Sequence, residues 1–286
     1  MKLAIFLQYI APKQLITIIA GKLANIECPS LTPKVIAWFV KRYQVNMQEA
    51  VNSDISSYKT FNDFFTRPLK SDARPIAKAT FICPVDGAIS QFGPIHKDQI
   101  FQAKGHDYST LALVAGNVPL ASHFEDGHFA CLYLSPKDYH RIHMPCAGKL
   151  ISMTHVPGDL FSVNPTTAEN VPNLFSRNER IVCEFSSEAH GRFLIVLVGA
   201  TIVGSMATVW HGTINPPRSQ SVKKWEYTNQ EISLKQGEEM GRFLLGSTVV
   251  MLFEKDTLSF NENWQPTHPI RLGEDMGKSN SALTQQ

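Results

Sequence analysis

The feature that most constrains the fold is a series of short apolar runs, rich in β-branched and aromatic residues, that begins after about residue 75. Such runs, bounded by Gly, Pro, Ser or Asp, are typical of β-strands. The connections between them are short and hold few helical patterns, which favours antiparallel pairing over parallel crossovers. The clearest predicted strands are 129–134, 180–185, 193–198 and 248–253.

The first 70 residues follow a different pattern, with apolar residues at helical spacing over 3–10 and 15–26. Thr32-Pro33 predicts an N-cap and the start of another helix, and Thr60-Phe-Asn-Asp63 resembles a capping box. We therefore predict an α+β fold, with N-terminal helices followed by a mostly antiparallel, β-rich catalytic body. The predicted division is a helical membrane-associating segment at 1–70, a β-rich catalytic domain at 71–272 and a disordered polar tail at 273–286.

The N-terminal apolar residues are interrupted by Pro12, Lys13 and Lys22, so no run approaches the roughly 18 residues of a spanning helix. Lys2 before an apolar stretch leaves a signal peptide open, although no convincing small-x-small cleavage site follows. Two other interpretations stay open: helices packed on the domain, or an interfacial pair whose lysines contact anionic headgroups while apolar side chains enter the bilayer.

Composition narrows the class of protein. The chain has 286 residues, of which 43% are hydrophobic, enough for one large domain or two small ones. The 27 basic and 25 acidic side chains form no block of like charge, so a nucleic-acid groove is not indicated. Five scattered cysteines without a Cys-x-x-Cys pair favour reduced thiols in a cytosol-facing protein over disulfides or a zinc site.

The Gly246-Ser247 bond has the chemistry of a bond that can cleave itself. Gly246 leaves its carbonyl carbon open to attack, and the Ser247 hydroxyl can reach back to it, converting the amide to an ester. β-Elimination, tautomerisation and hydrolysis would then leave a pyruvoyl group, whose carbonyl accepts the electrons of a departing carboxylate. Taken alone, residues 245–248 also fit an ordinary strand with a glycine bulge.

Other segments accompany this bond in a fixed order. They are Phe61-Asn-Asp-Phe-Phe-Thr-Arg-Pro-Leu-Lys70, Pro84-Val-Asp-Gly87, Tyr139-His-Arg-Ile-His-Met-Pro145, Asn178-Glu-Arg180, Val198-Gly-Ala-Thr-Ile-Val-Gly-Ser205 and Lys235-Gln-Gly-Glu-Glu-Met-Gly-Arg-Phe243. Together they resemble the phosphatidylserine decarboxylase proenzymes of the bacterial membrane-associated type. The resemblance runs from the first residues to about residue 260.

The resemblance implies a zymogen of phospholipid biosynthesis: a self-processing, pyruvoyl-dependent carboxy-lyase that converts phosphatidylserine to phosphatidylethanolamine and CO2. Asp86, His143 and Ser247 match the self-cleavage triad, with the cut between Gly246 and Ser247. His143 would act as the base and Asp86 would orient it, as in serine hydrolases. Ser247 would become the covalent pyruvoyl cofactor that forms a Schiff base with the substrate amine, and His140 would serve decarboxylation.

The same resemblance implies the partners. Cleavage would leave fragments 1–246 and 247–286 associated as a heterodimer, with a higher oligomer left open. The substrate would be phosphatidylserine in the membrane. We therefore expect a peripheral protein on the cytoplasmic side of the cell membrane.

Four alternatives remain from the residues themselves. A serine hydrolase could use Ser247, His143 and Asp86, although no Gly-x-Ser-x-Gly elbow surrounds Ser247. A pyruvoyl decarboxylase of a soluble amino acid would share the chemistry, and a membrane-bound binding module would share the N-terminal helices. His140 and His143 near Asp138 could suggest a metal site, but no third and fourth ligand is apparent nearby, and no metal is predicted.

Overall fold

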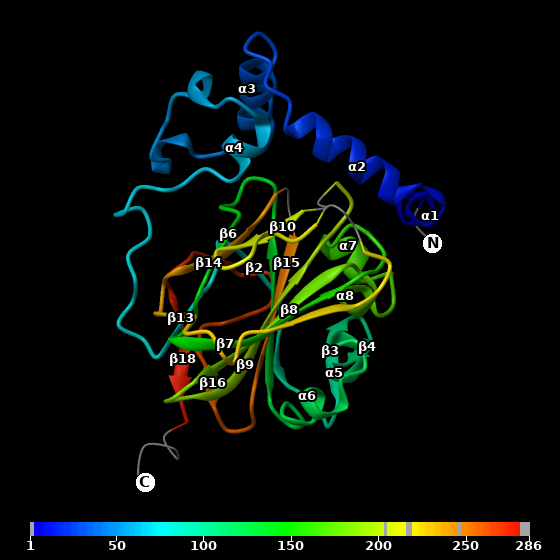
Figure 1. The fold of residues 1–286 in the computed structure, drawn as a ribbon, viewed down its shortest axis with the longest axis vertical. Coiled ribbons are helices and arrows are strands. Elements are labelled where there is room, and N and C mark those ends of the chain that lie inside the picture. Colours follow the sequence, from blue (N-terminus) through cyan, green and yellow to red (C-terminus); the bar gives the residue numbers. More distant parts are fainter. Residues whose placement is uncertain (1–2, 203–204, 216–218, 245–246, 281–286) are drawn as a thin grey trace.

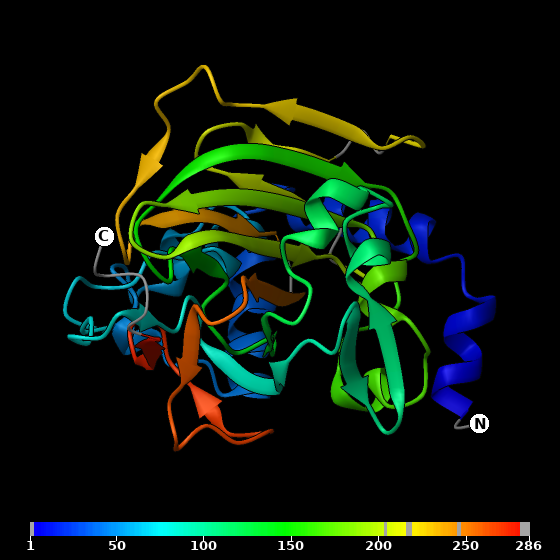
Figure 2. The same cartoon turned by 90° about the horizontal axis from the view of Figure 1, so that it is seen from below.

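Antiparallel strands form the body of the molecule, and the N-terminal helices lie across one end of it (Figure 1). The computed structural model describes residues 3–202, 205–215, 219–244 and 247–280. Seen from below, the strands curve as layered sheets, and α1 and α2 lie along one side (Figure 2). This arrangement confirms the predicted α+β class.

Within the described residues, the largest sheet has nine strands, and β15 (Ser247–Phe253) lies in its middle, between β9 and β5. The last five side chains of β15 are fully buried, as the continuous apolar run predicted. The strand order is β12 (Lys223–Glu226), β7 (Gly148–Val156), β8 (Arg180–Ser187), β9 (Gly191–Val198), β15, β5 (His128–Leu134), β2 (Gly87–Pro94) and β17 (Pro269–Ile270), with β13 (Ser233–Leu234) also on β7.

Three smaller sheets complete the body. A four-stranded sheet contains β11 (Gly212–Thr213), β10 (Met206–Thr208), β14 (Glu239–Phe243) and β6 (Arg141–His143). A three-stranded sheet contains β1 (Phe81–Ile82), β18 (Asp275–Ser279) and β16 (Leu258–Phe260), and a hairpin joins β3 (Gln99–Ala103) to β4 (His106–Ser109). Four short helices lie between strands: α5 (Thr110–Leu113), α6 (Val118–Ser122), α7 (Pro165–Ala168) and α8 (Leu174–Arg177).

The position of β18 corrects one prediction. Residues 273–286 were expected to be a disordered tail, but 275–279 form the central strand of the three-stranded sheet. Met276 is fully buried there, and β1 and β16 supply hydrogen-bond partners on both sides. The polar composition of 275–279 gives no strand signal in the sequence. The strand is stabilised by neighbours that are distant in sequence. Residues 281–286 lie outside the described residues.

The N-terminal segment folds as α1 (Leu3–Ile10), α2 (Lys13–Ala24), α3 (Thr32–Tyr43) and α4 (Phe61–Phe65), with 3-10 turns at Met47–Glu49 and Ile55–Ser57. The capping box predicted at Thr60 is confirmed: the Asp63 amide donates to Thr60 Oγ1 at 3.0 Å, and Thr60 N–H donates back to the Asp63 carboxylate at 3.1 Å. Thr32 is the first residue of α3 and not its cap, and its hydroxyl accepts from the Cys28 amide.

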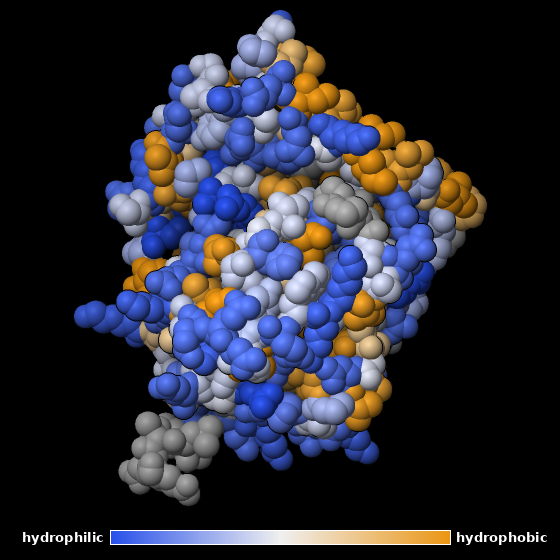
Figure 3. Space-filling view, in the orientation of Figure 1, coloured by the Kyte–Doolittle hydropathy of each residue, from blue (hydrophilic) through white to orange (hydrophobic). Residues whose placement is uncertain are grey.

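No helix within the described ranges combines the length and the apolar character that crossing a bilayer requires. Instead, α1 and α2 contact the body through few residues, among them Ile5, Thr17 and Ala24. Most of their large apolar side chains face outward, and Figure 3 shows them as an apolar band along this edge of the molecule.

Candidate active site

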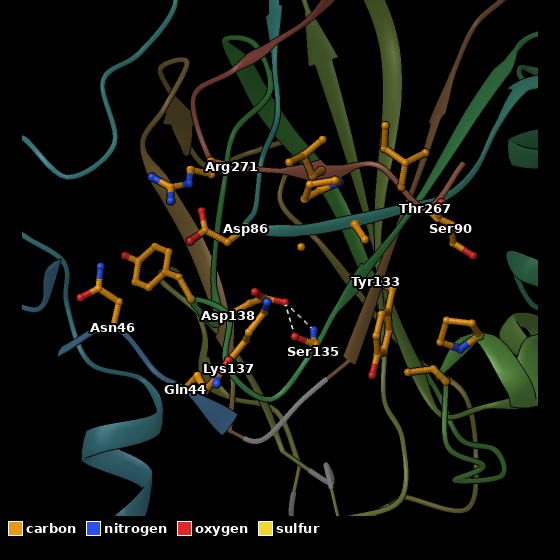
Figure 4. Close-up of a pocket in the computed structure, with 18 of the residues that line it drawn as sticks. Gln44, Asn46, Asp86, Ser90, Tyr133, Ser135, Lys137, Asp138, Thr267 and Arg271 are labelled. Carbon is orange, nitrogen blue, oxygen red and sulfur yellow. Dashed lines mark hydrogen bonds between the residues drawn. The ribbon is translucent and has the colours of Figure 1, made fainter. Parts of the chain in front are cut away.

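A cavity of about 630 Å³ opens between the N-terminal segment and the ends of the central strands. Its walls come from the residues after α3, the segment 67–74, the start of β2, the loop after β5 and the residues around β17. Figure 4 shows labelled side chains from these segments around the cavity: Gln44, Asn46, Asp86, Ser90, Tyr133, Ser135, Lys137, Asp138, Thr267 and Arg271.

Strand register brings the predicted cleavage segment to this cavity. Ser247 is opposite Leu134 on β5, and the next pair along joins Thr248 to Tyr133. Tyr133 is in turn opposite Ala88 on β2, two residues after Asp86. This register places the start of β15 and Asp86 at the same end of the sheet, two strands apart. Neighbouring strands lie about 4.8 Å from each other.

Gly87 explains how Asp86 reaches this position. A Cβ at residue 87 would lie 2.3 Å from the backbone oxygen of Tyr133, so only glycine allows β2 to approach β5 here. Asp86 therefore sits at the point where β2 joins the sheet. The Pro-Val-Asp-Gly segment is more than a surface turn.

Asp86 is buried and forms an ion pair with Arg74, a residue that no sequence motif identified as part of the site. Arg74 donates to both carboxylate oxygens of Asp86, at distances from 2.5 to 3.1 Å, and the Leu272 amide donates to Oδ1 at 2.9 Å. Arg74 also pairs with Glu49 at 2.8 Å. Burial by itself would lower the pKa of Arg74, but the hydrogen bonds to Asp86 and Glu49 raise it above its ordinary value.

His143 is held in one tautomer by its backbone partner. Its Nδ1 lies 2.8 Å from the Gly237 carbonyl, which can only accept, so Nδ1 carries the proton. Nε2 keeps its lone pair and lies 3.3 Å from the Tyr139 hydroxyl, which donates to it. Burial lowers the pKa of His143, so the imidazole is neutral at pH 7 and Nε2 can act as a base.

Gly237, whose carbonyl orients His143, has a φ of +79°, in the left-handed region that favours glycine. In the sequence, this residue stood out only as part of the 235–243 segment that contributes to the family resemblance. Its role as the partner of the histidine depends on the turn before β14, which residue spacing could not supply.

His140 is fully buried, and its ring lies 4.1 Å, centroid to centroid, from that of Phe65. Nδ1 donates to the Asp138 carbonyl at 2.8 Å, and within the described residues Nε2 has no hydrogen-bond partner. Burial lowers the pKa of His140 to about 3, which keeps the ring neutral. Its backbone carbonyl accepts from the Phe243 amide at 3.0 Å, four residues before Ser247.

The structure thus brings together part of the predicted triad. Asp86 lines the cavity, and the His143 amide donates to the Pro84 carbonyl at 2.9 Å, two residues before Asp86. The two side chains do not hydrogen-bond to each other: Asp86 binds Arg74, and His143 Nδ1 donates to the Gly237 carbonyl. Ser247 is placed by its backbone pairing alone. Gly246, the other half of the predicted cleavage site, lies outside the described residues.

The site offers a hydroxyl donor, an acceptor nitrogen and space beside residue 247, where the small ketoacyl group would form. His140 Nε2 and Thr248 Oγ1 are both buried and lack partners within the ranges described. Such atoms are costly to bury, so a ligand or covalent group that hydrogen-bonds to them would stabilise the site. Across the described ranges, no three His, Cys, Asp or Glu side chains converge as a metal site would require.

Comparison with known proteins shows which protein family this chain resembles. A family model described as phosphatidylserine decarboxylase matches residues 61–278, and a second, described as PSD, matches residues 3–44. The chain is 66% identical over 278 residues to the phosphatidylserine decarboxylase proenzyme of Dechloromonas aromatica (strain RCB), covering 97% of this chain and 98% of that protein.

Two further relatives show the same extent of similarity. The phosphatidylserine decarboxylase proenzyme of Azoarcus sp. (strain BH72) is 64% identical over 276 residues, covering 96% of each chain. That of Methylobacillus flagellatus (strain ATCC 51484 / DSM 6875 / VKM B-1610 / KT) is 65% identical over 273 residues, covering 95% of this chain and 97% of the relative. The similarity therefore includes the N-terminal helices, the cavity and the strand that starts at Ser247.

Proposed function

The chain belongs to the phosphatidylserine decarboxylase family, and we propose that it cuts its own Gly246-Ser247 bond to become a decarboxylase of phosphatidylserine. The products of the reaction are phosphatidylethanolamine and CO2. The observation that carries the proposal is the register of β2, β5 and β15, which aligns the start of β15 with the Asp86 end of β2 at the edge of the cavity.

Self-cleavage begins with the Ser247 hydroxyl. His143 Nε2 takes its proton, the oxygen bonds to the Gly246 carbonyl carbon, and the bond from that carbon to the Ser247 nitrogen breaks as the imidazolium returns the proton to that nitrogen. β-Elimination then releases the Gly246 carboxylate, and water replaces the nitrogen at residue 247 with a carbonyl oxygen as ammonia leaves. The Gly237 carbonyl holds the base in the required tautomer. The nearby charge of Asp86 favours the imidazolium that forms, since it raises the pKa of His143 against the larger effect of burial.

Ser247 would then provide the covalent pyruvoyl group, whose carbonyl condenses with the substrate amine and accepts the electron pair left by CO2. His140 fits a role in this second reaction because its neutral Nε2 is buried and free of other partners in the described structure. We propose that His140 moves the proton to the substrate α-carbon, since its Nε2 is an acceptor and cannot donate to the leaving carboxylate. Burial of the site keeps water from competing for these contacts.

The outward-facing apolar side chains of α1 and α2 support a membrane-bound substrate. A continuous exposed apolar surface of this kind marks a site of membrane or protein contact. Trp38 on α3 is 61% exposed, and tryptophan is a side chain suited to the membrane interface. We propose peripheral binding at the cytoplasmic side, which agrees with five free cysteines.

Two other activities give different experimental results. A serine hydrolase would keep Ser247 as an intact hydroxyl, and serine-directed inactivators would block it. A pyruvoyl decarboxylase of a soluble amino acid would show cleavage and CO2 release without needing a lipid headgroup. Neither alternative explains the apolar surface of α1 and α2.

The test is an intact mass spectrum of the purified protein with CO2 release from phosphatidylserine. We expect two fragments, 1–246 and 247–286, the smaller one beginning with a pyruvoyl group. Ser247→Ala and His143→Ala should remain uncut and inactive. His140→Ala should be cut normally but release CO2 at least about a hundredfold more slowly. An active parental protein that stays as one chain, or a small fragment with an unmodified serine, would contradict the proposal.

A further inference from the structure

Arg67 is a buried cation in the wall of the cavity that neither the triad nor His140 explains. It follows α4 directly, and its amide donates to the Phe64 carbonyl at 3.1 Å, so the capping box at Thr60 fixes where it stands. Its side chain is only 3% exposed. The guanidinium lies close enough to His140 to lower the pKa of that ring further, after the larger effect of burial.

The guanidinium has no counter-ion of its own. Within the described residues, no carboxylate oxygen lies within ion-pair distance of it, and its Nε has no partner. Its other nitrogens reach only the carbonyls of Phe64 and Lys137, at long distances of 3.5 and 3.4 Å. The ring of Phe64, 5.3 Å away, adds a cation–π contact that does not neutralise the charge.

The nearest acidic groups are already engaged. Asp86 and Glu49 both contribute favourable charge at Arg67, but their oxygens are bound by Arg74. Burial lowers the pKa of Arg67, yet a guanidinium stays protonated in proteins. A buried charge without a bound partner is costly, and an anion entering the cavity would offset that cost.

Two further cations at the cavity, Arg271 and Lys137, are exposed to solvent. Arg271 also lies 3.7 Å from Glu49. Water screens both, so they contribute little specific affinity. Arg67 combines burial, permanent charge and unused donors at one point of the wall.

We propose that Arg67 binds the phosphodiester of the lipid headgroup and so positions phosphatidylserine for decarboxylation, an inference that rests on the function proposed above. The headgroup carries two anions, the phosphodiester and the carboxylate. A cation bound to the carboxylate would stabilise the ground state of the group that loses its charge, which would oppose the reaction. The phosphodiester keeps its charge throughout, so a cation there binds substrate and transition state alike.

This assignment predicts the kinetic pattern. Binding that is equal in the ground and transition states changes KM and leaves kcat nearly unchanged. Arg67→Gln should therefore still be cut into two fragments, with KM for short-chain phosphatidylserine raised at least about tenfold and kcat within about threefold of the parental value. Arg67→Lys, which keeps the charge, should recover part of the loss.

Inhibition by the reaction product shows which of the two headgroup anions Arg67 binds. Short-chain phosphatidylethanolamine has the phosphodiester but no carboxylate, so its inhibition constant should rise in Arg67→Gln by about the same factor as KM. A rise in KM without a rise in this constant would mean that Arg67 binds the carboxylate, and the inference would be wrong. The matched control is Arg192→Gln, at the opposite end of the sheet, where the guanidinium pairs with Glu184.

A second measurement avoids the variants, in case Arg67→Gln fails to fold. On the parental mature protein, glycerophosphoethanolamine should inhibit at a concentration at least about tenfold below that of ethanolamine, since only the former carries a phosphodiester. Equal inhibition by the two would overturn the assignment. A parental protein that releases no CO2 contradicts the proposed function itself, whereas an Arg67→Gln protein with parental KM contradicts only this inference.

Discussion

His140 and His143 are three residues apart, and both donate Nδ1–H to a backbone carbonyl, yet their free nitrogens meet different surroundings. Nε2 of His143 contacts the Tyr139 hydroxyl, whereas Nε2 of His140 is buried without a partner in the described structure. The sequence predicted both residues as functional through family resemblance. The resemblance also gave them different roles, but it did not predict the different surroundings of their Nε2 atoms, because the turn at Gly237 and the ring of Phe65 come from distant segments.

The protonation state of His143 predicts how self-cleavage depends on pH. A histidine base works only when neutral, so the cleavage rate should rise as pH passes its pKa and stay level above it. Burial lowers the pKa of His143 below the ordinary value of 6.5, so the loss of rate should lie on the acid side of 6.5. His140, with a pKa of about 3, should not contribute to this profile above pH 5.

The measurement uses precursor made by cell-free translation, transferred to buffers from about pH 5 to about pH 8, with the fragments followed on a denaturing gel. Returning acid-treated samples to neutral pH should restore cleavage, which excludes irreversible unfolding, and circular dichroism at each pH excludes reversible unfolding. A half-maximal rate clearly above 6.5 would contradict His143 as a buried neutral base.

The helices α1 and α2 expose most of their large apolar side chains to solvent. A helix that packs on a domain normally hides its apolar side chains, but here Leu3, Ile10, Leu15 and Leu23 are all more than half exposed. Of the two interpretations that the sequence left open, this exposure favours the interfacial pair. Ile202 N–H donates to Thr17 Oγ1 at 3.1 Å, which ties α2 to the end of the sheet where β15 begins.

This surface predicts a loss of membrane binding when a charge is introduced. Ile19 on α2 is 48% exposed, and Ile19→Glu should weaken binding to vesicles of anionic and zwitterionic phospholipids by at least about tenfold. The control is Phe101→Glu on β3, where the side chain is 42% exposed on another part of the molecule. Co-sedimentation with vesicles measures both. Equal losses in the two variants would contradict α1 and α2 as the contact surface.

At the scale of the whole molecule, the proposed cut falls at the start of the central strand. Residues 247–280 contribute β15 between β9 and β5, β17 on β2 and β18 between β1 and β16. The five side chains from Val249 to Phe253 are fully buried, and each contributes about 1.5–3 kcal/mol by leaving water. The fragments are thus held mainly by backbone pairing and apolar burial, because the ion pair between Arg271 and Glu49 that joins them is 3.7 Å long and its arginine lies largely in solvent.

We therefore expect the two fragments to remain together after cleavage. They should elute as one species in size-exclusion chromatography even in about 1 M salt, which screens charges but does not weaken apolar contacts. Urea should separate them only as the sheet unfolds, seen by circular dichroism. Separation of folded fragments by salt alone would show that charge, and not the central sheet, holds them together.

The sequence by itself determined the family, the strand character of 248–253 and the capping box at Thr60, and it predicted the scissile bond, because these depend on local residue types and order. Only the tertiary structure assigned Arg74 to Asp86, the Gly237 carbonyl to His143, the buried strand at 275–279 and the uncompensated charge of Arg67. Each of these joins segments far apart in the chain. Their energies come from burial and from partners that no local pattern encodes.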